Sequence, residues 1–196
     1  METMQDTVKF IEKKKYPKEL PLLPLRDVII YPGMIMPLSI GREKSLKLIN
    51  SSYEGNKLLA LFCQKNLTKD DIEEDDIYKY GTIALIHKVI KAPDDTIKVV
   101  VQGLDRIKLK KLVSSDPYWL VNIQKIKEKD TNDDDKEQIE VLLKNIISLF
   151  QKAVGLSSYL PQELLLAAMN IEDPEKLSYL IASNLQLKLE EQQEIL

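Results

Sequence analysis

The sequence predicts an α+β protein: a β-rich amino-terminal part, built as a strongly bent sheet or small barrel, and then a helical bundle. Three observations lead to this prediction. Up to Ile126, short apolar runs rich in Ile, Leu and Val alternate with turn signals, and only one stretch has helical spacing. Residues 127–137, KEKDTNDDDKE, are charged and lack apolar periodicity. From residue 138 onward the apolar residues recur with the helical period. We therefore expect a β-rich domain at 1–126, a charged link at 127–137 and a helical bundle at 138–196.

The stretch from Glu19 to Lys44, ELPLLPLRDVIIYPGMIMPLSIGREK, organises the β-rich part. Its two apolar runs, Leu20–Ile30 and Met34–Ile40, predict two strands near a sheet edge or barrel rim, because both runs contain or adjoin proline. Proline lacks an amide donor and glycine tolerates positive φ. The Tyr31-Pro32-Gly33 sequence between the runs therefore predicts a turn.

Three large apolar residues, Met34, Ile35 and Met36, follow this turn. Successive side chains of a strand point to opposite faces, so the three cannot all face one side. One interpretation buries all of them between two layers. The other places one or two at the surface as a contact patch, to which flexible methionines are suited. On the second interpretation the candidates for contact with a protein partner are Tyr31, Pro32, Met34, Ile35 and Met36.

The rest of the β-rich part is assigned by period and turn chemistry. We expect a short helix at 42–53, strands at 57–64, 80–91 and 117–126, and a hairpin turn at 92–95. Residues 96–113 predict two strands hinged at Gly103, because glycine within a strand pattern indicates a bulge or bend. Residues 65–79 hold six acidic residues between Asp70 and Asp76 but lack the spacing of a calcium loop, so a solvated loop is expected.

Three helices and the start of a fourth are expected after the link. The first carries one apolar stripe and ends at Gly155; the stripe comprises Ile139, Leu142, Leu143, Ile146, Phe150 and Ala153. A shorter helix is expected at 161–170. Asp173-Pro174 predicts a helix start, an N-cap carboxylate followed by proline at the first helical position, and Asn184 its end. The last segment, KLEEQQEIL, starts a helix without a cap at its far end, which suggests a chain cut within that helix.

Composition and motifs exclude several classes of function. The net charge of −3 opposes a general nucleic-acid binder, and Lys108, Lys110 and Lys111 are the only dense basic group late in the β-rich part. The single cysteine, Cys63, excludes an internal disulfide and is expected as a buried, inert thiol. The single histidine, His87, is expected as a satisfied core or edge residue of a strand.

Catalytic signatures are missing from the sequence. There is no phosphate-binding glycine loop, no HExxH, no GxSxG and no paired-cysteine spacing. No run of eighteen apolar residues predicts a transmembrane helix. We assign no catalytic residue and no metal ligand, and we interpret the chain as a binding or assembly module.

Four segments resemble the amino-terminal region of the Lon family of ATP-dependent proteases. They are LPLLPLRDVIIYPGMIMPLSIGREKS, YGTIALI, KVVVQGLDRIKL and LLLAAMNIEDPEKLSYLIASNLQLKLEEQQEIL, and the resemblance covers residues 19–196. The first is shared with stand-alone proteins that carry a Lon-type substrate-binding domain. The IEDP and LKLEEQQEIL sequences of the last point to Lon itself.

The resemblance implies a PUA-like pseudo-barrel with one short helix, followed by a helical bundle. It implies a region that captures unfolded, damaged and degron-bearing proteins and supports assembly of a homohexamer in the bacterial cytoplasm. ATP and Mg²⁺ would serve the ATPase module of the full-length protein, whose peptidase is of the Ser–Lys type. No cofactor, enzymatic activity, membrane contact or nucleic-acid partner is expected of this chain alone. The alternative is a stand-alone protein of the same fold that acts as a protein-interaction module.

Overall fold

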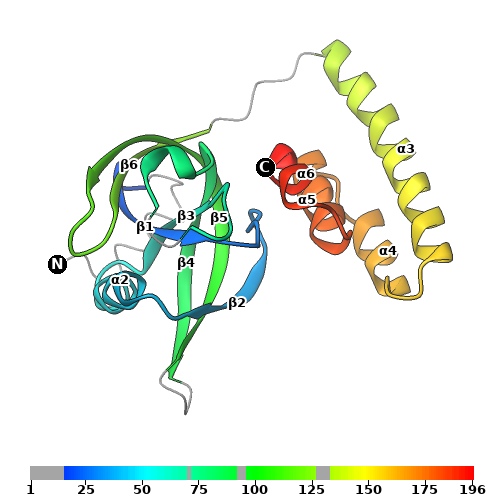
Figure 1. Ribbon diagram of the computed structural model, residues 1–196. Coiled ribbons are helices and arrows are strands. Elements are labelled where there is room, and N and C mark those ends of the chain that lie inside the picture. Colours follow the sequence, from blue (N-terminus) through cyan, green and yellow to red (C-terminus); the bar gives the residue numbers. More distant parts are fainter. Residues whose placement is uncertain (1–15, 70–71, 92–95, 127–132) are drawn as a thin grey trace. The chain divides into compact units, whose positions relative to one another are not determined.

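The computed structural model describes residues 16–69, 72–91, 96–126 and 133–196. The chain divides into two compact units, one ending at Ile126 and the other running from residue 127 to Ile195. Figure 1 shows the elements of both units, and we describe each unit separately.

The first unit is a six-stranded sheet with one α-helix. Its elements are β1 (Glu19–Leu25), β2 (Ile35–Ile40), α2 (Glu43–Glu54), β3 (Leu58–Cys63), the 3₁₀-helix η1 (Glu74–Asp76), β4 (Tyr80–Lys91), β5 (Ile97–Ser114) and β6 (Leu120–Lys125). The strand order is β2-β5-β4-β3-β1-β6, and β6 pairs with β5 as well as with β1. The pairings therefore form a circuit through five strands, and β2 is added to β5 outside this circuit. Every pair is antiparallel except β1–β3.

Apolar side chains from these strands fill the interior of the first unit. A core cluster is formed by Leu20, Leu22, Leu58, Ala60, Phe62, Ile77, Ile83, Ile107, Leu109, Trp119, Val121 and Ile123. The strand β3 is buried along its whole length, between its partner strands β1 and β4. The predicted α+β class is confirmed, as are the helix after Gly41 and the strands at 57–64, 80–91 and 117–126.

Two predicted strands differ in extent from those observed. The first ends at Leu25, and the chain bends at Arg26 and Asp27 instead of continuing to Ile30. Ile30 is buried, but its carbonyl accepts a hydrogen bond from the Thr82 hydroxyl (2.5 Å) instead of from a neighbouring strand. The apolar residues up to Ile30, which predicted a longer strand, are therefore explained by burial outside a strand.

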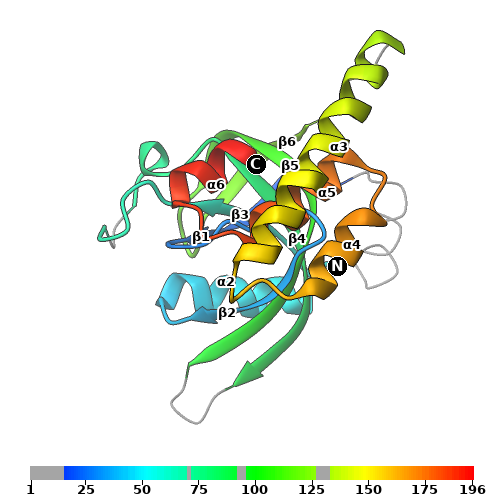
Figure 2. The same cartoon turned by 90° about the vertical axis from the view of Figure 1, so that its right-hand side faces the viewer.

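Residues 97–114 form one strand instead of two hinged at Gly103. Along β4 and β5 the partner of Ile83 is Asp105, whereas the partner of Ala84 is Gly103, so Leu104 is the extra residue of a bulge. The bulge absorbs the bend without ending the strand. Beyond it, toward the hairpin end, β4 and β5 continue as a long ribbon, and β2 pairs with β5 there from Gln102 to Ile97 (Figures 1 and 2). The turn predicted at 92–95 lies outside the described residues.

The second unit contains α3 (Asp133–Leu156), α4 (Gln162–Met169), α5 (Pro174–Asn184) and α6 (Leu189–Ile195). Residues 133–137, predicted as part of the link, form the start of α3, and residues 127–132 lie outside the described part. The core cluster comprises Phe150, Val154, Leu160, Ala168 and Leu177. None of the described helices is both long enough and apolar enough to cross a membrane.

The apolar stripe predicted for α3 is wrong in part. Leu143, Ile147, Phe150 and Val154 face the core cluster, whereas Leu142 is 58% exposed and Ile146 is also exposed. The amino-terminal half of α3 extends beyond the other helices of this unit (Figure 2). The predicted start of α5 is confirmed, because Asp173 accepts hydrogen bonds from the backbone N–H of Glu175 (3.0 Å) and Lys176 (3.2 Å).

Candidate functional site

The segment Tyr31–Met34 is a tight turn. The Met34 N–H donates to the Tyr31 carbonyl (3.1 Å), Pro32 occupies the second position, and Gly33 has a φ of 84°. These features define a type II turn, in which proline sets the first central φ and glycine supplies the positive one. The predicted turn is therefore confirmed, and its conformation is dictated locally.

This turn is seated on the bulge of β5. The Gly33 N–H donates to the Gly103 carbonyl, and the Gly103 N–H donates to the Met34 carbonyl, both at 2.9 Å. A Cβ atom on Gly103 would lie 2.2 Å from the Tyr31 carbonyl oxygen, far inside van der Waals contact. Glycine at position 103 therefore permits the turn to rest directly on the strand.

The five contact candidates lie in different environments. Tyr31 is 1% exposed, and burial raises the pKa of its hydroxyl to about 12. We therefore leave Tyr31 out of the candidate surface. Pro32, Met34 and Met36 are half-buried, and Ile35 is 59% exposed. Among these residues, Ile35 has the largest exposed fraction.

Alternation along β2 separates these side chains into two faces. Met36 shares a face with the buried Leu38 and Ile40, whereas Ile35 lies on the other face with the exposed Pro37 and Ser39. The three apolar residues after the turn thus do not form one patch. Pro37, which sequence reasoning did not single out, extends the face of Ile35.

A groove of about 680 Å³ opens beside β2. The residues that line it belong to the stretch from the end of β1 to Val28 and to the stretch from β2 into α2; they are Leu23–Val28, Met36–Arg42 and Ser45. Met36 lines this groove together with the β2 residues that follow it, whereas Ile35 does not. A strand with apolar side chains on both faces and a groove at its side can contact an extended chain.

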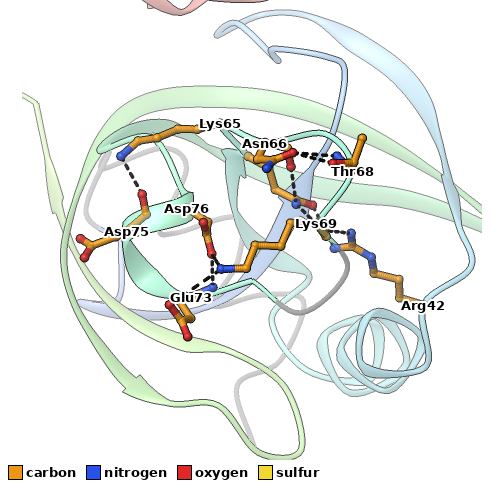
Figure 3. Close-up of polar contacts among 9 residues, drawn as sticks. Arg42, Lys65, Asn66, Thr68, Lys69, Glu73, Asp75 and Asp76 are labelled. Carbon is orange, nitrogen blue, oxygen red and sulfur yellow. Dashed lines mark hydrogen bonds and ion pairs between the residues drawn. The ribbon is translucent and has the colours of Figure 1, made fainter.

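Arg42, at one end of this groove, is fixed by a polar network. Its guanidinium donates to the Gln64 side-chain carbonyl (3.0 Å) and to the Lys69 backbone carbonyl (3.3 Å). Gln64 is fully buried and donates in turn to the Asn66 and Lys69 carbonyls. Figure 3 shows how Arg42 reaches across to the loop after β3. The network holds the start of α2, and with it the end of the groove, against that loop.

The same network orders the described part of the acidic loop. Lys69 lies 2.6 Å from the Asp76 carboxylate, and this hydrogen bond lowers the pKa of Asp76 (Figure 3). Glu73 and Asp76 form a reciprocal capping box around η1. Asp70 and Asp71 lie outside the described residues. Within the part that the structure describes, no three His, Cys, Asp or Glu side chains are placed to hold a metal ion.

The lone cysteine and histidine lie in ordinary surroundings. Cys63 is buried, as predicted, and burial raises the pKa of its thiol to about 11. His87 is exposed on β4, and its Nε2 lies 2.8 Å from the Gln102 side-chain oxygen. Between the partners of Ile86 and Lys88 the register shifts, so His87 is the extra residue of a second bulge. It is therefore an edge histidine, paired with Gln102 and outside the apolar core.

Comparison with known proteins identifies the family. A family model described as "ATP-dependent protease La (LON) substrate-binding domain" matches residues 19–196. The chain belongs to the Lon substrate-binding domain family. Among curated relatives, the Lon protease of Dictyoglomus thermophilum is 40% identical over 180 residues, which is 92% of this chain and 22% of that protein. The Lon protease of Trichlorobacter lovleyi is 36% identical over 194 residues, 99% of this chain and 24% of that protein.

A solved structure of a Lon amino-terminal domain shares the fold. The "N terminal domain of Mycobacterium avium complex Lon protease" superposes with a TM-score of 0.54 at 21% identity, covering 84% of this chain and 96% of that one. This chain therefore has the fold of that Lon amino-terminal domain. It spans less than a quarter of the length of the Lon proteases compared above.

Proposed function

We propose that this chain is the substrate-recognition and assembly region of an ATP-dependent Lon protease that degrades unfolded, damaged and degron-bearing proteins. The observation that carries the proposal is the family match over residues 19–196, which includes the helical unit as well as the β unit. The remainder of such a protein would supply an ATPase module using ATP and Mg²⁺ and a Ser–Lys peptidase. The protein would act in the bacterial cytoplasm as a homohexamer.

The site proposed to contact clients is the apolar surface around the Pro32–Gly33 turn and β2. Unfolded proteins differ from folded ones in exposing apolar side chains, and an exposed Ile35 beside a half-buried Met36 can bury such groups without reading a sequence. Each contact would be weak. Six copies in a ring would raise the effective concentration of the surface, so weak binding by one copy would suffice.

A stand-alone interaction module of the same fold is the alternative. The helical unit favours the proposal over this alternative, because the match to the Lon proteases of D. thermophilum and T. lovleyi continues across it. A reading frame that continues into a phosphate-binding GxxxxGK[ST] motif would support the proposal.

The test is a binding titration of residues 1–196 against one protein in two forms. The first form is native; the second is kept unfolded by reduction and alkylation of its cysteines. We expect binding of the unfolded form alone, with little change between low and high salt, because apolar contacts are screened little. Absence of binding to either form would contradict client recognition by this region, and a steep fall with salt would indicate a charged surface instead.

A matched pair of variants then locates the contact. Ile35→Ser removes the exposed isoleucine of β2, and Ile90→Ser makes the same change at the exposed Ile90 on β4. Removing a half-exposed isoleucine from a client contact costs about 1 kcal/mol, or about fivefold in affinity. We expect this loss for Ile35→Ser and none for Ile90→Ser, with unchanged Trp119 fluorescence in both. Equal affinities for the two variants would place client contact elsewhere.

A further inference from the structure

Among the strands that the structure describes, β2 has one edge without a partner. It is the first strand in the order β2-β5-β4-β3-β1-β6 and pairs there with β5 alone. An edge strand presents a row of backbone N–H and C=O groups, on which another extended chain can add. Which groups of β2 point outward follows from its register with β5.

The hydrogen bond from Gly103 N–H to the Met34 carbonyl sets this pattern. This hydrogen bond joins Gly103 and Met34, which are the residues next to Gln102 and Ile35 in the ladder. Hydrogen-bonded and non-hydrogen-bonded pairs alternate, so the Ile35–Gln102 pair is a non-hydrogen-bonded pair. The kinds alternate along an antiparallel ladder, so Pro37–Val100 and Ser39–Lys98 are also non-hydrogen-bonded pairs. The backbone groups of Ile35, Pro37 and Ser39 therefore point away from β5.

Five backbone groups face outward at this edge. They are the N–H and C=O of Ile35, the C=O of Pro37, and the N–H and C=O of Ser39, since proline has no amide hydrogen. No hydrogen bond joins these groups to another residue in the part of the chain that the structure describes. The strand therefore offers two donors and three acceptors, at the two-residue spacing of a strand.

The side chains of β2 leave this edge open to an apolar chain. None of its six residues, IMPLSI, is charged, whereas exposed edges are usually protected by charged side chains. Pro37 is the single protective residue, and it removes one donor only. Met36 and its neighbours on β2 line the groove described above, so an added chain could place alternate side chains there.

The size of the edge determines the kind of occupant. Six residues span about 20 Å, and one added strand covers about 5 Å beside them, so an added segment contacts of the order of 100–200 Å². A stable contact between two folded copies needs about 800 Å² from each partner. This edge is therefore too small for a dimer and of the right size for a short extended segment.

We propose that the free edge of β2 binds an extended segment of an unfolded protein as an added strand, through main-chain hydrogen bonds to Ile35, Pro37 and Ser39. This inference rests on the proposed function and specifies how its clients are held. Unpaired main-chain N–H and C=O groups are available in every unfolded chain, whereas the paired strands of folded proteins already use theirs. The edge would thus distinguish unfolded from folded proteins without reading their sequence.

Three variants of the full chain test the proposal. Ser39→Pro removes one outward donor and places a ring at the edge; Pro37 already occupies the equivalent outward position two residues earlier. Ser39→Ala removes the hydroxyl but keeps the N–H and is the matched control. Pro37→Ala adds an outward donor. One main-chain hydrogen bond corresponds to about fivefold in affinity. We expect Ser39→Pro to bind the unfolded protein at least about fivefold more weakly, Ser39→Ala unchanged, and Pro37→Ala more tightly.

A peptide probe tests main-chain pairing directly. The probe is an eight-residue peptide of alternating Val and Thr with blocked ends, compared with the same peptide N-methylated at every second residue. We expect binding of the unmodified peptide alone, and Pro37→Ala should strengthen it.

The two proposals fail in different ways. If the wild-type chain binds unfolded protein but the Ser39 and Pro37 variants and the methylated peptide bind like their controls, strand addition is wrong and client recognition stands. If the wild-type chain binds neither the unfolded protein nor the peptide, both are wrong. Should Ser39→Pro alter Trp119 fluorescence, Pro37→Ala and the peptide pair still decide the outcome.

Discussion

Replacing Gly103 with alanine should destabilise the β unit without affecting the helical unit. The new Cβ atom would lie 2.2 Å from the Tyr31 carbonyl oxygen and 3.2 Å from a methyl group of Ile30. Moving either neighbour would cost free energy, because the first is a backbone atom and the second belongs to a buried side chain. The turn must therefore lift off β5.

The magnitude follows from the contacts that are lost. Overpacking costs about 1–3 kcal/mol. The two hydrogen bonds between Gly103 and the turn contribute about 1 kcal/mol each. Alanine recovers about 0.5–1 kcal/mol by restricting the unfolded chain. We expect the unfolding free energy of the β unit to fall by about 2–4 kcal/mol, which lowers its urea midpoint by about 1–2 M.

Two optical signals separate the units in this assay. Trp119, the single tryptophan, belongs to the core of the β unit, so its fluorescence reports that unit. Circular dichroism at 222 nm is dominated by the helices. The matched control is Gly155→Ala in α3, where an added Cβ meets nothing within 4 Å, and alanine should stabilise the helix by about 0.5–1 kcal/mol.

A Gly103→Ala variant with the wild-type fluorescence midpoint would contradict this prediction. That result would mean that the turn moves away from β5 at no cost. A fluorescence midpoint lowered equally by Gly155→Ala would also contradict it, because the effect would then not depend on the Tyr31 contact.

Two further predictions concern an N-cap and a buried thiol. Asp173→Ala should lower the unfolding free energy of the helical unit by about 1 kcal/mol, measured by circular dichroism, because two backbone N–H groups of α5 lose their acceptor; Asp173→Asn, which keeps an acceptor, should lose much less. Burial raises the pKa of Cys63 from 9.0 to about 11, so at pH 9 the folded protein should react with a thiol reagent about fiftyfold more slowly than the protein in urea. The raised pKa favours the folded state below pH 9, and that stabilisation should be lost as the pH rises from about 9 to 11. Equal thiol reactivity in the folded and unfolded protein would contradict this, as would an Asp173→Asn variant no more stable than Asp173→Ala.

Features decided by local chemistry were predictable from the sequence. The turn at Pro32-Gly33 and the start of α5 at Asp173-Pro174 depend on residues within a few positions of each other, and both are observed. Cys63 lies in a continuous apolar run, which already implied its burial. In each case the residues that determine the feature are close together in the sequence, so a local sequence pattern predicts it.

Features decided by distant partners were not predictable in the same way. Gly103 was recognised as a bulge or bend, but its contact with Tyr31 depends on a residue far away in the sequence. The exposure of Leu142 could not be foreseen, because the period of α3 fits two adjacent faces and the positions of α4 and α5 select one. Likewise, the free edge of β2 is known only from the strand order. The outward orientation of the backbone groups of Ile35, Pro37 and Ser39 results from the pairing of β2 with β5. The sequence of β2 alone does not determine this pairing.

The pairing of β1 with β6 has a consequence for synthesis of the protein. Glu19 pairs with Asn122, so the first strand to be made waits for a partner about a hundred residues later. At about 5–20 residues per second, this wait lasts roughly 5–20 s, during which the apolar residues of β1 lack part of their final cover. The newly made chain would itself expose an apolar, unpaired strand of the kind proposed above to bind at the edge of β2. Until β6 has been made, the chain would therefore resemble the clients proposed for it.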